Sequence, residues 1–297
     1  TLVVKPSLSI PDLSALLIRR QLQGKPDQIM RALMDHGYFR LSGYWRYFQI
    51  DPANGLNDFE TGTKLSDVLD IYATDAQLRN LLLEGMAEVE TSLRAILVAR
   101  ICTPGGSGLE YWDPQTYDGE SRDKHGDSHR AKLLADMVKD IERSKERHVM
   151  HHREKGGATA VPMYVAVEAF SFGTLSRMYG LLSDDSLKSA VARRYSYSTP
   201  AHFSTNIRAV AVFRNACAHH SRIWNRHIRQ DVPRIWPGLV QAPLATRNYH
   251  KTAWGTIAVV ADMVSQVRRD ASFMGDIQQL ISSRAAYENG LTNPSLK

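Results

Sequence analysis

The 297-residue sequence contains only two cysteines, Cys102 and Cys217, and they lie far apart in the chain. A disulfide framework and a four-cysteine zinc site are therefore excluded, and a reducing cytoplasm is the simplest setting. No apolar run approaches the roughly 18 residues that a membrane-spanning helix needs. The first eight residues also lack the long apolar core of a signal peptide. We therefore expect a soluble cytoplasmic protein that makes no use of a membrane.

The sequence also lacks internal repeats, a glycine-rich phosphate loop and the alternating pattern of half-buried strands. Apolar residues instead recur at three- and four-residue steps, most clearly between residues 65 and 101, where we expect one short helix and one long helix. The pattern predicts an all-α fold with further helices over residues 13–20, 27–35, 130–153, 161–182, 186–195, 201–218 and 255–281. An interruption is expected at residues 172–174 within the helix 161–182.

Two segments are predicted from these patterns. Residues 1–60 form an N-terminal helical and aromatic segment packed on the core, and residues 61–297 form a larger helical domain with an inserted loop over 103–127. The stretch 36–48 is dense in aromatic residues and includes Arg40 and Arg46. It is either a platform on which unpaired bases stack or a packed helix junction. Its two glycines and Leu41 favour packing.

No carboxylate occurs between Phe213 and Arg226, although this segment contains several arginines, two histidines and two asparagines. From Arg193 to Arg234 there are eight arginines, no lysine and one acid, Asp231. Arginine binds phosphate through two parallel hydrogen bonds, and histidine transfers protons near neutral pH. The segment is therefore either a site that acts on a phosphodiester or a solvated basic face.

Spacing limits how these side chains can meet. Asn215 precedes His219 by four residues and shares its helix face, whereas Arg214 precedes it by five, about 140° away around an ideal helix. Arg214 and His219 cannot share one face unless the helix bends or ends there, or unless each serves a different subunit. Arg222 follows His219 by three residues and can share its face.

Two other pairs have helical spacing. Glu90 and Arg94 lie four residues apart, and they form either a surface ion pair or part of a site with Arg214 and His219. His148 and His152 have the spacing of metal ligands on a helix, but neither a glutamate between them nor a nearby cysteine completes the set. We assign no metal and no cofactor.

Five stretches together resemble the Abi-like proteins, a bacterial abortive-infection group within the HEPN superfamily. They are residues 36–44, 72–94 and 168–176, the six residues from Arg214 to His219, and residues 217–226. The segment Arg214–His219 resembles the HEPN motif, in which arginine and histidine are separated by four to six residues. The resemblance covers roughly residues 11–230.

The resemblance implies a HEPN-like helical bundle with an N-terminal helical extension. It also implies metal-independent RNA cleavage by a homodimer, and a toxin role in phage defence that a partner RNA or protein restrains. Arg214, Asn215 and His219 are the expected catalytic residues. An RNA-binding module without catalysis, its basic face held by an antitoxin RNA or protein, is the alternative; a structural protein that binds an acidic partner is a third. The supporting residues that we assign for RNA are His220, Arg222, Asn225, Arg226, Glu90, Arg94 and Arg40.

Overall fold

The computed structural model of the chain describes residues 7–236, 239, 251–282 and 284–294. This part contains thirteen α-helices and one small antiparallel sheet, so the prediction of an all-α protein is confirmed. The two strands, β1 (Gln49–Asp51) and β2 (Leu56–Phe59), form a short hairpin, although the sequence shows no alternating strand pattern.

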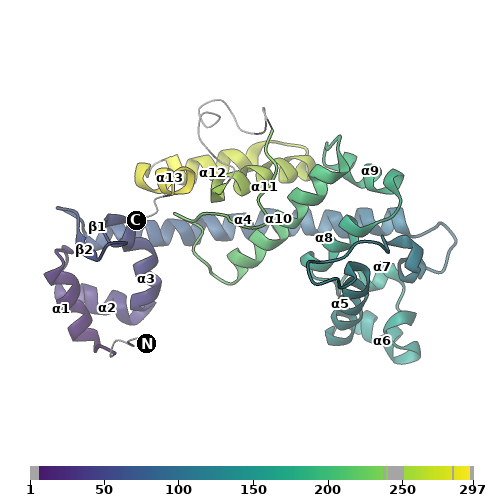
Figure 1. Cartoon of the computed structure of the whole chain (residues 1–297), viewed down its shortest axis with the longest axis horizontal. Helices are drawn as coiled ribbons and strands as arrows, with labels where there is room; N and C mark the ends of the chain where they lie inside the picture. The colour runs from purple at the N-terminus through teal and green to yellow at the C-terminus, as the bar shows by residue number, and fades with distance from the viewer. Residues whose placement is uncertain (1–6, 237–238, 240–250, 283, 295–297) are drawn as a thin grey trace.

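Helix α4 (Leu65–Ile101) runs along most of the molecule (Figure 1) and is one continuous helix of 37 residues, so the expected division into two helices is wrong. No glycine or proline interrupts the segment between Tyr72 and Leu78. Asp75, which breaks the apolar pattern there, is buried and bound by partners from other elements. The apolar side chains of α4 that are fully buried are Val68, Leu78, Leu82, Met86, Val89, Leu93 and Leu97.

The N-terminal elements gather at one end of α4 (Figure 1). They are α1 (Ile10–Arg19), α2 (Pro26–His36) and α3 (Tyr38–Trp45), followed by the 3-10 turn η1 (Arg46–Phe48) and the hairpin. Tyr44 and Trp45 are each 1% exposed, which supports the packing interpretation of the aromatic stretch. Phe39, in contrast, is 89% exposed.

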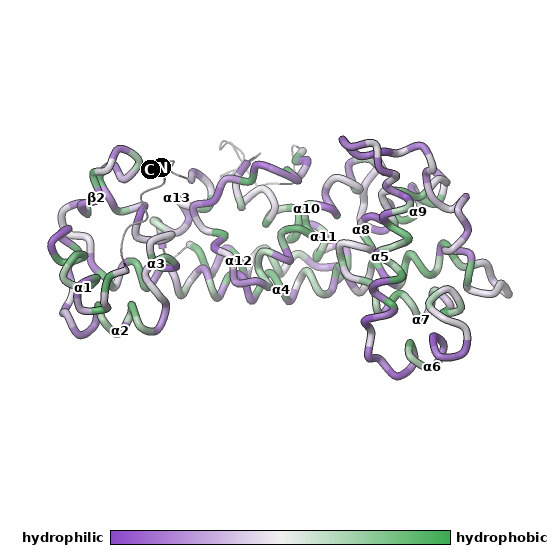
Figure 2. Tube along the Cα trace, turned by 60° about the horizontal axis from the view of Figure 1, so that its bottom comes forward, coloured by the Kyte–Doolittle hydropathy of each residue, from purple (hydrophilic) through white to green (hydrophobic). Residues whose placement is uncertain are grey.

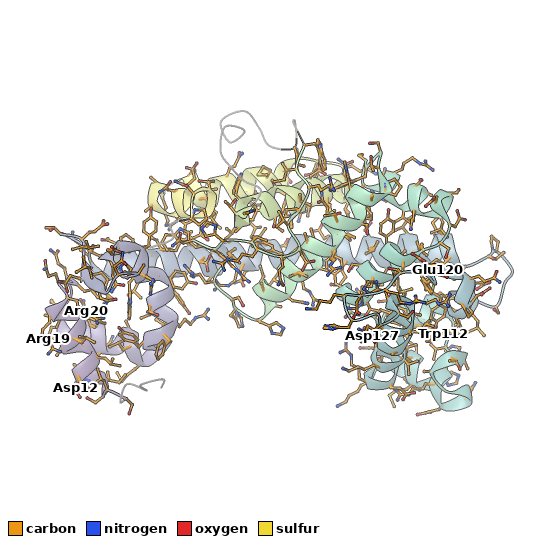
Figure 3. All side chains as sticks on the ribbon, viewed as in Figure 1. Asp12, Arg19, Arg20, Trp112, Glu120 and Asp127 are labelled. Carbon is orange, nitrogen blue, oxygen red and sulfur yellow. The ribbon has the colours of Figure 1, made fainter. Side chains whose placement is uncertain are left out.

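The opposite end of α4 carries α5 (His129–Arg143), α6 (Arg147–Gly156), α7 (Met163–Ala166), α8 (Phe172–Leu181) and α9 (Asp185–Arg194). The helix expected over 130–153 is two helices, because the backbone turns to an extended conformation at Ser144. The segment 103–127 contains short 3-10 turns, η2 (Glu110–Trp112) and η3 (Pro114–Thr116). Near its end Asp127, labelled in Figure 3, pairs with Lys132 at 2.8 Å.

Four helices pack along the middle of α4: α10 (Pro200–Ala218), α11 (Ala253–Arg268), α12 (Ser272–Ser282) and α13 (Ala285–Thr292). Hydrophobic residues concentrate where α4, α10 and α11 meet (Figure 2). The single helix expected over 255–281 is wrong, because Arg269 adopts a left-handed conformation that ends α11. Within the described ranges, no helix is long and apolar enough to cross a membrane.

The carboxylate of Asp75 lies at the centre of this packing and has no solvent exposure. Its Oδ2 atom forms an ion pair with Arg79, one turn further along α4, and accepts a 2.7 Å hydrogen bond from the hydroxyl of Tyr44 in α3. Its Oδ1 atom accepts a 2.9 Å bond from the hydroxyl of Tyr287 in α13. Burial, followed by the charge of Asp75, raises the pKa of both Tyr44 and Tyr287 well above the usual value for tyrosine.

Asp75 also binds the segment that follows α10. The backbone N–H of Trp224 donates to Oδ1 at 2.9 Å, and that of Ile223 donates to Oδ2 at 3.4 Å. The indole of Trp224 donates to the Tyr287 carbonyl at 3.0 Å. A side chain at Gly290 would begin 2.2 Å from the indole nitrogen, so this close approach requires glycine. The chain after α10 is therefore fixed against both α4 and α13.

Replacing Asp75 with asparagine should destabilise the protein strongly, because Arg79 would keep a buried charge without its partner. We expect Asp75→Asn to lower the free energy of unfolding by about 3–5 kcal/mol, measured by urea denaturation. The matched control is Asp70→Asn, an exposed aspartate on the same helix, for which a change within about 0.5 kcal/mol is expected. Equal unfolding midpoints for Asp75→Asn and the wild type would contradict the role given to this carboxylate.

Candidate active site at the end of helix α10

Helix α10 ends within the Arg214–His219 motif. His219 is the C-cap residue, and His220 has a left-handed backbone with φ of 54°. The N–H of Ser221 bonds to the carbonyl of Ala216 at 2.8 Å, and the N–H of His220 bonds to that of Cys217 at 3.0 Å. This hydrogen-bond pattern is a Schellman motif, which usually has glycine where His220 stands. A left-handed non-glycine residue costs about 1–2 kcal/mol, so the surrounding structure must hold the turn in place.

Arg40 of α3 is one of the groups that hold the turn. Its Nη2 donates to the His220 carbonyl at 2.9 Å, and its Nε donates to the hydroxyl of Tyr72 in α4 at 3.1 Å. The guanidinium also lies over the Tyr72 ring, 5.4 Å from the ring centre. We had assigned Arg40 to RNA contact on sequence grounds; the structure places it half-buried beside the turn, in contact with the backbone of the motif.

The polar side chains of the motif face solvent on this fixed backbone. Asn215, His219 and His220 are all exposed. In the part of the chain that the structure describes, neither imidazole forms a hydrogen bond or ion pair. Both histidines are therefore accessible to a ligand while their backbone is held rigidly.

Arg214 is held from the other side by α4. Its Nη2 lies 3.1 Å from Oε2 of Glu90, which is 4% exposed, and the other Glu90 oxygen pairs with Arg94 at 2.6 Å. Arg94 also donates to the carbonyls of Val167 and Phe170, each at 3.1 Å. The Glu90–Arg94 pair is thus buried more deeply than a surface ion pair, and it contacts the motif directly.

Arg214 and His219 are not in direct contact. Among the described residues no hydrogen bond or ion pair joins them, although Nη1 of Arg214 reaches Oδ1 of Asn215 at 3.4 Å. Asn215 and Ala218 lie between them around the end of the helix, and both are exposed. The two side chains therefore stand on either side of an open surface made by small residues.

Of the remaining predicted residues, Arg222 and Asn225 make contacts within the fold, whereas Arg226 is exposed. The expectation that Arg222 shares the face of His219 is wrong, because the helix ends at Ala218. Arg222 instead packs against α3, with its Nε 3.3 Å from the position of a side chain at Gly43, and burial lowers its pKa. The backbone N–H of Asn225 donates to the carbonyl of residue 290 at 3.1 Å, so this residue anchors the segment. Arg226 is exposed, as are the two histidines.

Some residues that build the site carried little signal in the sequence. Asp75 and Arg79 have the four-residue spacing of an ordinary surface pair, and their position inside an apolar helix was the available clue. Cys217 lies within the motif but is fully buried, and burial raises its pKa to about 12, so its thiol is not a nucleophile. No cluster of three or more metal-binding side chains occurs in the described residues.

Comparison with known proteins agrees with the resemblance seen in the sequence. A family model described as "Abi-like protein" matches residues 31–225, which is more than half of the chain and includes the Arg214–His219 motif. Searches of curated proteins and of solved structures returned no match. By the extent of the family match, the chain belongs to the Abi-like protein family.

Proposed function

We propose that this protein is the toxin of a bacterial phage-defence system and that it cleaves RNA at the end of α10 as a HEPN-type endoribonuclease. Membership of the Abi-like family points to abortive infection as the biological setting. The observation that carries the proposal is the arrangement at residues 214–220: two solvent-exposed imidazoles on a rigid turn, with an arginine oriented by a buried glutamate beside them. The substrate is RNA, and the expected place of action is the cytoplasm.

The proposed reaction needs no metal. His219 takes the proton from a ribose 2′-hydroxyl, and the 2′ oxygen attacks the adjacent phosphorus. The bond to the 5′ oxygen breaks, and that oxygen takes up a proton from water or from the neighbouring imidazole of His220. The products are a 2′,3′-cyclic phosphate and a 5′-hydroxyl. DNA lacks the 2′-hydroxyl and is not a substrate.

Arg214 has the chemistry to stabilise the negative charge that develops on the phosphoryl oxygens. Glu90 engages Nη2 of Arg214, while the guanidinium remains about one-third exposed and carries five N–H donors in all. Orientation by Glu90 reduces the freedom that the side chain would lose on binding a phosphate. Asn215, which accepts from Arg214, is positioned to contact the same phosphate.

A homodimer follows from this assignment. One chain supplies one arginine–histidine pair, and HEPN nucleases combine two such pairs across a two-fold axis. The surface formed by Asn215, Ala218 and His219 is exposed and made of small and polar groups, which suits a close approach of a second copy. A non-coding RNA or a protein antitoxin that covers the basic segment would silence the site.

The first test is RNA cleavage in EDTA by the wild type and by His219→Ala. We expect fragments with 2′,3′-cyclic phosphate ends from the wild type, and a rate lower by about 10²–10⁴-fold for the variant, because general base catalysis is lost. His202→Ala is the matched control, since His202 lies on the same helix far from its C-terminal end. If neither the wild type nor His219→Ala cleaves RNA while both bind it tightly, the protein is a non-catalytic RNA-binding module and not an enzyme.

A second prediction concerns His220. Replacing it with glycine removes an imidazole and also relieves the left-handed strain, so His220→Gly should raise stability by about 1 kcal/mol while it lowers cleavage. Thermal unfolding and initial cleavage rates, measured on the same preparation, separate the two effects. A variant that is more stable and fully active would remove His220 from the site and leave it a purely conformational position.

A third prediction tests the dimer. Inactive His219→Ala protein, added in excess and exchanged with the wild type, should lower cleavage below the level that simple dilution gives, because mixed dimers have an incomplete site. Sedimentation of the mixture shows whether the subunits have exchanged. Unchanged activity after complete exchange would show that each chain carries a self-sufficient site.

A further inference from the structure

A pocket of about 300 Å³ lies beside α10, on the face next to the one that carries His219. Four residues of α10 form one wall, and the segment 226–231 forms the other, with Thr256 of α11 also contributing. The volume is at the lower end of pockets that bind small organic groups. The α10 residues that line it are Ala209, Val212, Phe213 and Ala216.

This pocket adjoins the proposed catalytic surface. Ala216 precedes His219 by three residues, which corresponds to a rise of about 4.5 Å along the helix. Val212 lines the pocket and is 47% exposed, so it presents apolar surface to solvent there. A chain of RNA lying across His219 would therefore have its next nucleotide beside this pocket.

The charged residues that line the pocket differ in whether they already have a partner. Arg226 and Arg229 are exposed, and in the described ranges neither forms an ion pair or hydrogen bond. The Oδ1 atom of Asp231 pairs with Arg208 at 2.6 Å, and among the described residues no partner is found for its Oδ2 atom. The pocket thus combines an apolar wall, two available guanidinium groups and one carboxylate oxygen that is left to accept a hydrogen bond.

We propose that this pocket binds the base of the nucleotide next to the cleaved phosphate and that it selects a base with an exocyclic amino group. The inference rests on the proposed function. Single-stranded RNA is recognised by packing of its unstacked bases on side chains and by hydrogen bonds to their edges, with cations on the backbone. The apolar wall receives the ring, Arg226 and Arg229 take the flanking phosphates, and Asp231 accepts from the amino group, as carboxylates do from cytosine N4.

The test compares two RNA hexamers, hexacytidylate and hexauridylate, because their bases have the same size and differ mainly at C4 in the amino or keto group. Binding is measured by fluorescence anisotropy with the His219→Ala protein, so that the RNA stays intact. We expect hexacytidylate to bind about tenfold more tightly than hexauridylate. Asp231→Ala should reduce this ratio to near one.

Two further variants distinguish base selection by the pocket from overall affinity for RNA. Val212→Trp places an indole in the pocket and should abolish the preference for hexacytidylate; sedimentation and thermal unfolding check that its fold and assembly are unchanged. Arg229→Ala should weaken both hexamers equally and reduce the slope of log affinity against log salt by about one. Arg147→Ala, an exposed arginine on α6, is the control and should change neither quantity.

Equal binding of the two hexamers, or an unchanged preference in Val212→Trp, would overturn the proposed pocket. Cytidine monophosphate is included as a competitor, and binding as tight as that of hexacytidylate would identify a free-nucleotide site instead. The outcome is independent of catalysis. Cleavage by the wild type without any base preference would support the proposed nuclease and contradict the proposed base pocket. Preferential binding of hexacytidylate without cleavage would support the pocket and contradict the nuclease.

Discussion

A carboxylate that has no access to water must be matched by hydrogen-bond donors, and Asp75 meets this requirement with groups from four separate parts of the chain. Tyr44 comes from α3, Arg79 from α4 itself and Tyr287 from α13. The fourth contribution consists of the backbone N–H groups of residues 223 and 224. One buried charge therefore holds together four parts of the chain: the N-terminal segment, helix α4, helix α13 and the segment after α10.

The turn at the end of α10 benefits directly from this dependence. His220 keeps a left-handed backbone although it is not glycine, and such conformations persist only where the surrounding structure determines them. Arg40 holds its carbonyl, and Asp75 holds the chain three residues further along. The backbone of the motif is thus fixed by buried contacts, while the side chains of His219 and His220 stay exposed to solvent.

Periodicity was sufficient to predict the helical class, and the local excess of arginine and histidine is the sequence signal on which the candidate site rests. The residues around it were predicted less well for two physical reasons. Arg222 was placed on a helix face because no glycine or proline marks the end of α10; the helix ends at a Schellman turn that uses His220 instead. Asp75 was missed because its partners are distant in sequence, with Tyr287 lying 212 residues further along. Local patterns do not contain such contacts.

Glu90 connects the segment 168–176 with the Arg214–His219 motif through two arginines. Its first oxygen binds Arg94, whose Nε and Nη2 also donate to the carbonyls of Val167 and Phe170, on either side of the start of the segment 168–176. Its second oxygen binds Arg214, which is still about one-third exposed. Arg94 therefore makes its contacts within the fold, and Arg214 is the more exposed of the two cations, with 35% of its side chain accessible against 19% for Arg94. The carboxylate of Glu90 partly offsets the charge of Arg214 and also orients its guanidinium. The exposed edge of this guanidinium lies beside Asn215, on the surface between Arg214 and His219.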